Sequence, residues 1–251
     1  MRRWISILIC AISLSLTAQE AKNEIDFDAE EAARELAAKQ GFRFSVSYRI
    51  EAGYVQDWQH SFTNSYPDTY FHGAKLGATV DFNLPHHTCI QTGLLYALTY
   101  GENFQHWRNV SLENTSPQIQ EHYILRHNLL IPVRATYTQR LWRDLALYFY
   151  GGPQMAIGLA YSDHIYNNLN PATLLWLEQQ NIKTEDYDRL AQRELHRFDI
   201  QMGVGLGLQW AGYRFVGGYD FGLNNLVRAA GQHAWDWSWY VGFSYGINYK
   251  L

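Results

Sequence analysis

The sequence predicts an all-β fold: an eight-stranded antiparallel up-and-down barrel that spans a membrane. Three observations predict it. From residue 42 onward, apolar and polar residues alternate with a period of two in eight segments, which is the pattern of β-strands. The apolar face of each segment carries no Asp, Glu, Lys or Arg, although these residues make up 18% of the chain. The connections are alternately short and long, as in membrane barrels with short turns on one side and long loops on the other.

The first 18 residues have the pattern of a signal peptide, with cleavage expected after Ala18. Two arginines follow the initiating Met, and residues 5–16 are apolar. The alternative is an N-terminal membrane anchor, which is less well supported because the apolar stretch is too short to span a bilayer. Cys10 would be removed with this segment, so Cys89 would be the single cysteine of the mature chain and could form no internal disulfide.

The sequence of residues 19–41 predicts a helical leader on the periplasmic side. Asp28 can cap a helix, with Glu31 at the capping-box spacing. Residues 29–40 are mostly strong helix formers, and Gly41 suits the C-terminal end. The leader is expected to lie in solvent or to act as a plug or docking element, and the sequence leaves both open.

The barrel itself is expected to occupy residues 42–251. In order, the alternating segments cover residues 42–54, 70–82, 90–100, 123–137, 145–161, 198–210, 213–221 and 235–251. A charge at the middle of a bilayer costs about 2–4 kcal/mol, so a wall in lipid must lack charges. Aromatic residues concentrate at both strand ends, as expected at two membrane–water interfaces, and Tyr161 is assigned to one of these girdles. A soluble lipocalin-like barrel is the alternative.

The polar face of the strands is expected to line the inside of the barrel. An eight-stranded barrel is only wide enough inside for its side chains, and a buried unpaired charge is costly. The sequence therefore favours a packed ionic core over a conducting or substrate-binding channel. Gly203, Gly205 and Gly207 share this face and are expected to leave room for the arginines. The charged residues on this face are Arg43, Arg49, Glu51, Lys75, Asp81, Arg126, Arg134, Asp199, Arg214, Asp220, Asp236 and Lys250.

The longest loop, residues 162–197, is predicted to carry any specific activity, because long loops are uncommon without a role. Asn170 and Pro171 open a first predicted helix over 172–180, and Thr184 can cap a second helical segment. The apolar side chains of this loop are expected to pack over the barrel mouth or to form a surface for a protein partner. They are Leu174, Leu175, Leu177, Tyr187, Leu190 and Leu195.

Several short motifs resemble a known family. They are Leu130-Ile131-Pro132-Val133, Gly151-Gly152-Pro153, Asp199 followed by Gly203-x-Gly205-x-Gly207, and Tyr219-x-x-Gly222-Leu223-x-Asn225. Their order and spacing, over about residues 42–251, resemble the PorT-like outer-membrane β-barrels of Bacteroidetes. The resemblance implies an eight-stranded barrel in a Gram-negative outer membrane. The family takes its name from a member that is needed for secretion across the outer membrane. Most of its members have no assigned activity. Leu251 departs from the aromatic residue that usually ends such barrels.

Catalysis is weakly indicated. The ten histidines show no ligand spacing, so no metal or cofactor is expected. A net charge of −4 and a pI near 6.2 argue against nucleic-acid binding. We expect a non-catalytic, porin-like outer-membrane protein with a structural, surface-contact or secretion-accessory role through its long loops. Outer-membrane lipid and the barrel-assembly machinery are expected partners. The alternative is a barrel enzyme that modifies lipids by acyl transfer or deacylation.

Overall fold

The computed structural model describes residues 45–61, 69–85, 87–107, 118–142, 145–180 and 182–247. The predicted signal peptide and leader, together with Arg43 and Lys250, lie outside these residues. None of the helices in the described part of the chain is long and apolar enough to cross a membrane.

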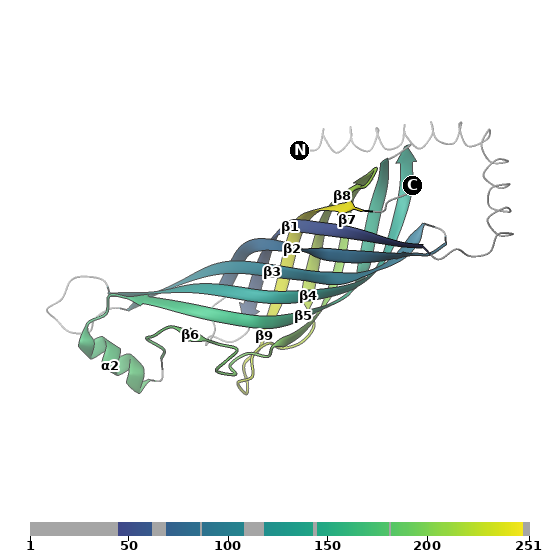
Figure 1. The fold of residues 1–251 in the computed structure, drawn as a ribbon. Helices are drawn as coiled ribbons and strands as arrows, with labels where there is room; N and C mark the ends of the chain where they lie inside the picture. The colour runs from purple at the N-terminus through teal and green to yellow at the C-terminus, as the bar shows by residue number, and fades with distance from the viewer. Residues whose placement is uncertain are drawn as a thin grey trace, which may run out of the picture. The chain divides into compact units, whose positions relative to one another are not determined.

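Eight long antiparallel strands form a closed ring (Figure 1). Each strand pairs with the strands before and after it, and the pairing of β1 with β9 and of β4 with β5 completes the ring. The predicted eight-stranded up-and-down barrel is confirmed. The strands are β1 (Ser45–Ser61), β2 (Thr69–Asn83), β3 (Thr88–Trp107), β4 (Gln118–Trp142), β5 (Leu145–Asn167), β7 (Phe198–Trp210), β8 (Tyr213–Gly222) and β9 (Ala234–Gly246).

The connection from β5 to β7 holds the other two elements. Helix α2 (Pro171–Gln179) begins where predicted, because the Asn170 side chain accepts a hydrogen bond from the Thr173 N–H at 2.7 Å. The second predicted helix, from Thr184, is wrong. That segment forms the two-residue strand β6 (Tyr187–Asp188), paired with β5, and then turns. The Asp188 carboxylate accepts from the Ala191 N–H at 2.8 Å, which stabilises a turn after β6.

Large apolar side chains cover the outside of the ring, and charged side chains fill the inside. Leu76, Val204 and Leu206 expose 60, 54 and 61% of their surface, whereas Arg49 and Lys75 on the inner face expose 1 and 2%. This arrangement is the reverse of a soluble protein and suits a wall that meets lipid. It follows directly from the alternation, because successive side chains of a strand point to opposite faces.

A register shift between β4 and β5 corrects one assignment made from the alternation. The pairing skips Leu159 on β5, opposite His127 and Asn128 on β4, so that β5 carries one extra residue. Beyond this bulge the inward and outward positions exchange. Tyr161 is buried, and its hydroxyl donates to Gln59 Oε1 at 2.9 Å. Tyr161 therefore belongs to the interior and not to the aromatic girdle at the membrane interface.

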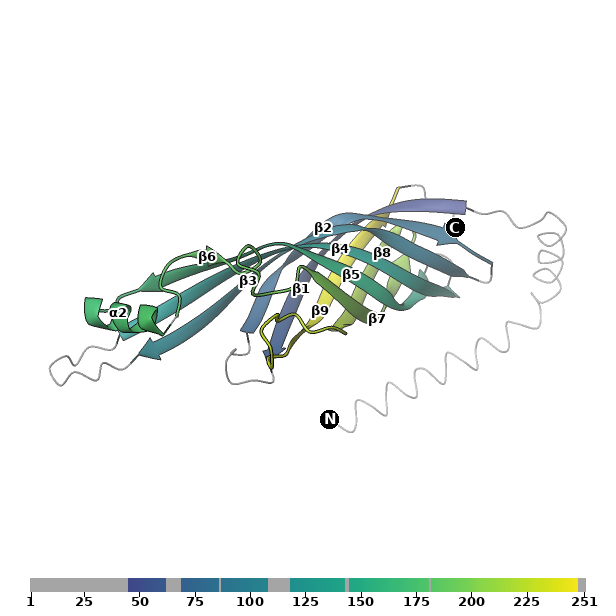
Figure 2. The ribbon, with the colours of Figure 1, turned by 90° about the horizontal axis from the view of Figure 1, so that it is seen from below.

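Strands β3, β4 and β5 are longer than a membrane requires. They have 20, 25 and 23 residues, against 13, 10 and 13 for β7, β8 and β9. A tilted strand of roughly 9–11 residues spans a bilayer. Beyond Gly101, the last β3 residue paired with β2, the three strands continue together toward α2 (Figures 1 and 2). We call this extension the tongue; it comprises residues 102–107, 118–123, 164–180 and 182–189. The short turns lie at the opposite end of the strands.

Candidate functional site

Within the described part of the chain, four ion pairs between strands join residues of the predicted interior set. The Arg126 guanidinium of β4 contacts the Asp236 carboxylate of β9. Each of the paired side chains exposes 11% or less of its surface. Charges buried so deeply need partners, because an unpaired one would keep the full cost of its desolvation. The structure thus brings eight of the predicted interior residues together as pairs. The other three pairs are Arg134–Asp220 at 3.7 Å, Arg214–Asp81 at 3.3 Å and Lys75–Glu51 at 3.5 Å.

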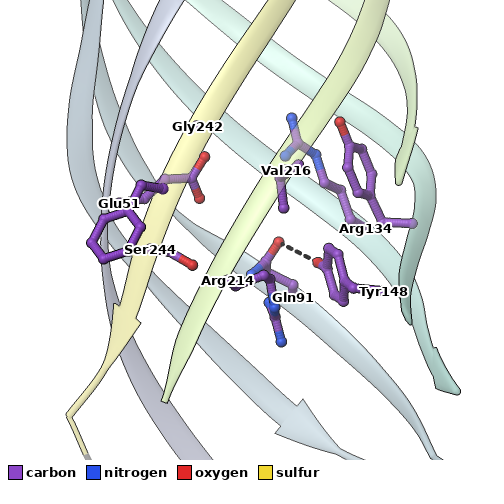
Figure 3. Close-up of a pocket in the computed structure, with 10 residues that line it drawn as sticks. Glu51, Gln91, Arg134, Tyr148, Arg214, Val216, Gly242 and Ser244 are labelled. Atoms are coloured by element: carbon purple, nitrogen blue, oxygen red, sulfur yellow. Dashed lines mark hydrogen bonds between the residues drawn. The ribbon is translucent and has the colours of Figure 1, made fainter. Parts of the chain in front are cut away.

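Tyr148 packs among these charges from β5. The Arg214 guanidinium lies 3.7 Å from the centroid of the Tyr148 ring, a cation–π geometry. The Tyr148 hydroxyl donates to Gln91 Oε1 at 3.2 Å. Figure 3 shows these three side chains together with Glu51 and Arg134 around one small space inside the ring. Side chains from five strands therefore fill the same level of the lumen.

Tyr150 and Tyr240 meet across the barrel through their hydroxyl groups. The Lys75 ammonium lies 3.1 Å from the centroid of the Tyr240 ring. Gly205 and Gly218 permit this packing, because a Cβ atom at either position would overlap Tyr150. Gly205 thus makes room for a tyrosine, and not for an arginine as the sequence suggested.

Three interior cavities that the described residues line are small. Their volumes are about 10, 30 and 20 Å³, room for one or two water molecules each. A larger hollow of about 480 Å³ opens at the short-turn end, where Ser47, Cys89 and Thr136 line it with polar groups. Asp81 and Arg214 also line this hollow. The ion pair between them therefore lies at the boundary between the hollow and the packed interior.

Arg49 and Asp199 complete the predicted interior set within the described residues. Arg49 donates from Nε to Ser244 Oγ at 3.1 Å and from Nη2 to the Gly212 carbonyl at 2.9 Å. It therefore fastens β1 to β9 and to the β7–β8 turn. Asp199 is buried and accepts a hydrogen bond from Gln201 Nε2 at 2.8 Å.

Asp57 and Gln59 are interior residues that the sequence reasoning missed. Asp57 Oδ2 lies 3.8 Å from Arg126 Nη1, and Gln59 accepts the bond from Tyr161. Both continue the β1 alternation that includes Arg49 and Glu51. They were missed because the strand was expected to end at residue 54, whereas β1 continues to residue 61.

Two buried side chains and one half-buried arginine hold the base of the tongue. His122 Nδ1 on β4 lies 3.0 Å from Asp163 Oδ1 on β5, and Arg189 Nε donates to Asp163 Oδ2 at 3.1 Å. Because Arg189 follows β6, this group ties the long loop to the two strands. His122 Nε2 is buried and has no hydrogen-bond partner within the described part of the chain. The imidazole is therefore enclosed and not presented to solvent.

The predicted partner surface is divided by the structure. Leu177, Leu190 and Leu195 are buried, so they are not available to a partner. Leu190 and Leu195 belong to an apolar cluster, with Phe71, Ile124, Tyr161, Val227 and Ala234, that lies across the barrel mouth. Leu174 and Tyr187 are half-buried. Leu175 exposes 59% of its surface, and its neighbour Trp176, which the helical pattern did not single out, exposes 48%.

The fold and the closed, charge-filled interior define a membrane β-barrel of the small, side-chain-packed kind. The chain belongs to the outer membrane protein beta-barrel domain family, whose pattern matches residues 18–228. The bacterial outer membrane is accordingly its location. The long loops of such barrels are generally extracellular and the short turns periplasmic, and the tongue lies at the long-loop end of the strands.

Several solved structures are similar to the chain at low sequence identity. The attachment invasion locus protein Ail of Yersinia pestis, solved with the heparin analogue sucrose octasulfate, is 12% identical, with 81% of this chain and 99% of Ail covered and a TM-score of 0.36. Neisserial surface protein A is 11% identical, with 80% of this chain and 98% of that protein covered and a TM-score of 0.36. The outer membrane protein OprG of Pseudomonas aeruginosa is 10% identical, with 82% of this chain and 98% of OprG covered and a TM-score of 0.34. No curated protein sequence matches the chain.

Proposed function

We propose that the protein is a non-catalytic outer-membrane barrel that presents the tongue to a protein partner at the cell surface. The observation that carries this proposal is the unequal length of the strands. Strands β3 to β5 extend well past the length that a bilayer requires and carry α2 at their far end (Figures 1 and 2). A rigid scaffold that holds a short element away from the membrane is a common way to display a recognition surface.

Helix α2 supplies the contact residues of this proposal. Leu175 and Trp176 are adjacent and largely exposed, while Leu177 is buried and fixes the helix to the rest of the loop. Exposed Trp and Leu side chains on a fixed helix suit the apolar groove of another protein. The occupant that we propose is therefore a protein with such a groove.

A lipid-modifying activity has less support. The His122–Asp163 pair has the residue types of a catalytic dyad, but Asp163 is also held by Arg189, and His122 Nε2 is buried. A general base must reach the proton that it removes. The enclosed imidazole supports a structural role, and an unchanged lipid A acylation profile in a deletion strain would agree with it.

The resemblance to PorT-like barrels favours one kind of partner. If the chain is of this subfamily, we propose that the partner is a component of a secretion pathway across the outer membrane. The motifs that carry the resemblance lie in the barrel strands and in the β8–β9 loop, whereas the proposed contact residues lie in α2. The two proposals can therefore be tested separately.

The test uses full-length protein in its own cells, with a photo-crosslinking residue at position 175. We expect one discrete adduct, which disappears when Trp176 is also changed to Ser. The matched control places the crosslinker at Leu223, which exposes 52% of its surface on the loop after β8. Complementation provides the second readout: Leu175→Ser/Trp176→Ser should fold with normal heat-modifiable mobility and fail to restore a deletion phenotype. Full restoration by this variant would overturn the proposal.

A further inference from the structure

A second surface with a different chemistry lies on the barrel rim, on the loops around β7. The segments 190–197 and 223–233 contain three arginines, Arg193, Arg197 and Arg228, and one acidic residue, Glu194. All three arginines are exposed. We call these three residues the basic rim.

Backbone pairing brings the two segments together. Leu195 and Val227 form an antiparallel bridge, and the Arg228 N–H donates to the Glu194 carbonyl at 3.0 Å. The Arg228 side chain donates from Nε to the Leu195 carbonyl at 3.1 Å. Because Leu195 and Val227 are buried in the cluster across the barrel mouth, the rim is anchored from below. Its arginines are therefore held on a fixed frame.

The basic rim continues directly into the lipid-facing wall. Arg197 Nη1 donates to the Leu159 carbonyl at 3.4 Å, and Arg197 immediately precedes β7. Below it, Leu159, Phe198 and Ile200 expose 47, 46 and 42% of their surface on the outside of the ring. Positive charge thus stands at the outer edge of an apolar surface that the bilayer covers. This is the arrangement that an anionic lipid headgroup above its acyl chains would match.

Farther around the ring, on β3 and β4, the wall carries the other sign of charge. There the hydroxyls of Tyr100 and Tyr123 donate to Glu102 and Glu121, each at 2.6 Å. These tyrosines stand at the extracellular ends of the membrane wall on β3 and β4. At this level of the wall, carboxylates therefore lie on β3 and β4, whereas guanidiniums lie beside β7.

We propose that the basic rim binds the phosphate groups of a phosphorylated glycolipid in the outer leaflet of the outer membrane. Arginine is suited to this role because its planar guanidinium donates two parallel hydrogen bonds to phosphate. The glycolipid's acyl chains would lie on Leu159, Phe198 and Ile200. This surface is separate from α2, and the proposal does not depend on a protein partner there.

The test is native mass spectrometry of the full-length protein in detergent with diphosphoryl lipid A as the probe. Wild-type protein should retain lipid A, and each arginine changed to Gln should weaken retention about fivefold, the usual effect of one basic residue at an anionic membrane surface. The triple variant Arg193→Gln/Arg197→Gln/Arg228→Gln should lose nearly all of it. Arg140→Gln, an exposed arginine at the periplasmic end, is the matched control and should retain lipid A normally.

Two further arms separate the lipid from simpler ligands. Fully dephosphorylated lipid A should bind the wild type no better than diphosphoryl lipid A binds the triple variant. Inorganic phosphate at millimolar concentration should not displace the lipid, because the acyl chains also contact the wall. If the triple variant fails to fold, Arg193→Gln/Arg197→Gln keeps the Arg228 contact with Leu195 and should still weaken retention. Equal retention by the variants, equal binding of dephosphorylated lipid A, or displacement by phosphate alone would each overturn the proposal.

Discussion

The lumen and the tongue use the same residue types under opposite conditions. Inside the ring, arginines, carboxylates and tyrosines from distant strands contact one another and leave cavities of only about 10 to 30 Å³. In the tongue, the His164–Asp186 pair leaves more than half of each side chain exposed, and Leu175 and Trp176 face outward. The difference teaches that charged side chains stabilise the inside of this barrel, whereas the exposed apolar side chains of α2 lie outside the ring.

The largest expected effect comes from removing one charge of an interior pair. Asp81→Asn leaves the Arg214 guanidinium buried without its carboxylate. Breaking a buried pair typically costs about 3–5 kcal/mol, so the free energy of unfolding in lipid vesicles should fall by roughly that amount. Urea titration followed by heat-modifiable mobility measures it.

Two controls sharpen this test. The double change Asp81→Leu/Arg214→Met removes both charges and should recover most of the loss. Asp186→Asn in the tongue should change the free energy of unfolding by less than about 1 kcal/mol, because exposed pairs contribute little. Equal losses for Asp81→Asn and Asp186→Asn would show that the interior is not a packed ionic core.

The next effect concerns the outer wall. Leu206→Arg places a charge in lipid and should cost about 2–4 kcal/mol if it lies near the midplane of the bilayer. Leu175→Arg, at a similarly exposed position on α2, should leave assembly unchanged because that residue meets water. The yield of heat-modifiable protein in the outer membrane compares the two, and equal yields would contradict the assigned membrane position.

A smaller and local effect is expected at the base of the tongue. Asp163→Asn weakens the contacts with His122 and Arg189, and losing hydrogen bonds to a buried group costs about 1–3 kcal/mol. Limited proteolysis should then cut residues 182–197 faster while the ring stays resistant. Loss of protection across the strands as well would mean that the tongue and the barrel unfold as one unit.

The smallest effect is a pH dependence at the outer part of the tongue. The hydrogen bond with His164, together with the N–H of Ile165, holds the pKa of Asp186 below its usual value of 3.8. Since the folded pKa is the lower one, the contact stabilises the tongue above about pH 4, and the contribution is lost as the pH falls through the lowered pKa. The hydrogen-exchange protection of the Ile165 amide should therefore decline below pH 4. Asp186→Asn should remove this dependence.

The alternation was sufficient to predict the ring and its two faces. An uncharged outer face and a charged inner face are strong constraints, because reversing either would place charges in lipid. The bulge at Leu159 could not be foreseen from the alternation. One extra residue in a strand exchanges the inward and outward faces only for the residues beyond it, and the sequence carries no separate signal for it. For that reason the alternation placed Tyr161 on the outside.

The loop was only half predictable for a similar reason. Asn170 and Pro171 are local signals, and they placed the start of α2 correctly. The burial of Leu190 and Leu195 depends on contacts in a cluster with Phe71 and Ile124, which are far away in the sequence. A helical spacing of apolar residues could not reveal that these two side chains close the barrel mouth from a turn.

The central claim is that the interior is closed by its own side chains. The most direct measurement is a planar-bilayer recording of the purified full-length protein at neutral pH. The account predicts no steady, large single-channel steps at neutral pH, because the ion pairs and the joined Tyr150 and Tyr240 occupy the lumen and the cavity beside them is small. Stable steps of uniform, large conductance from the wild-type protein at neutral pH would contradict it.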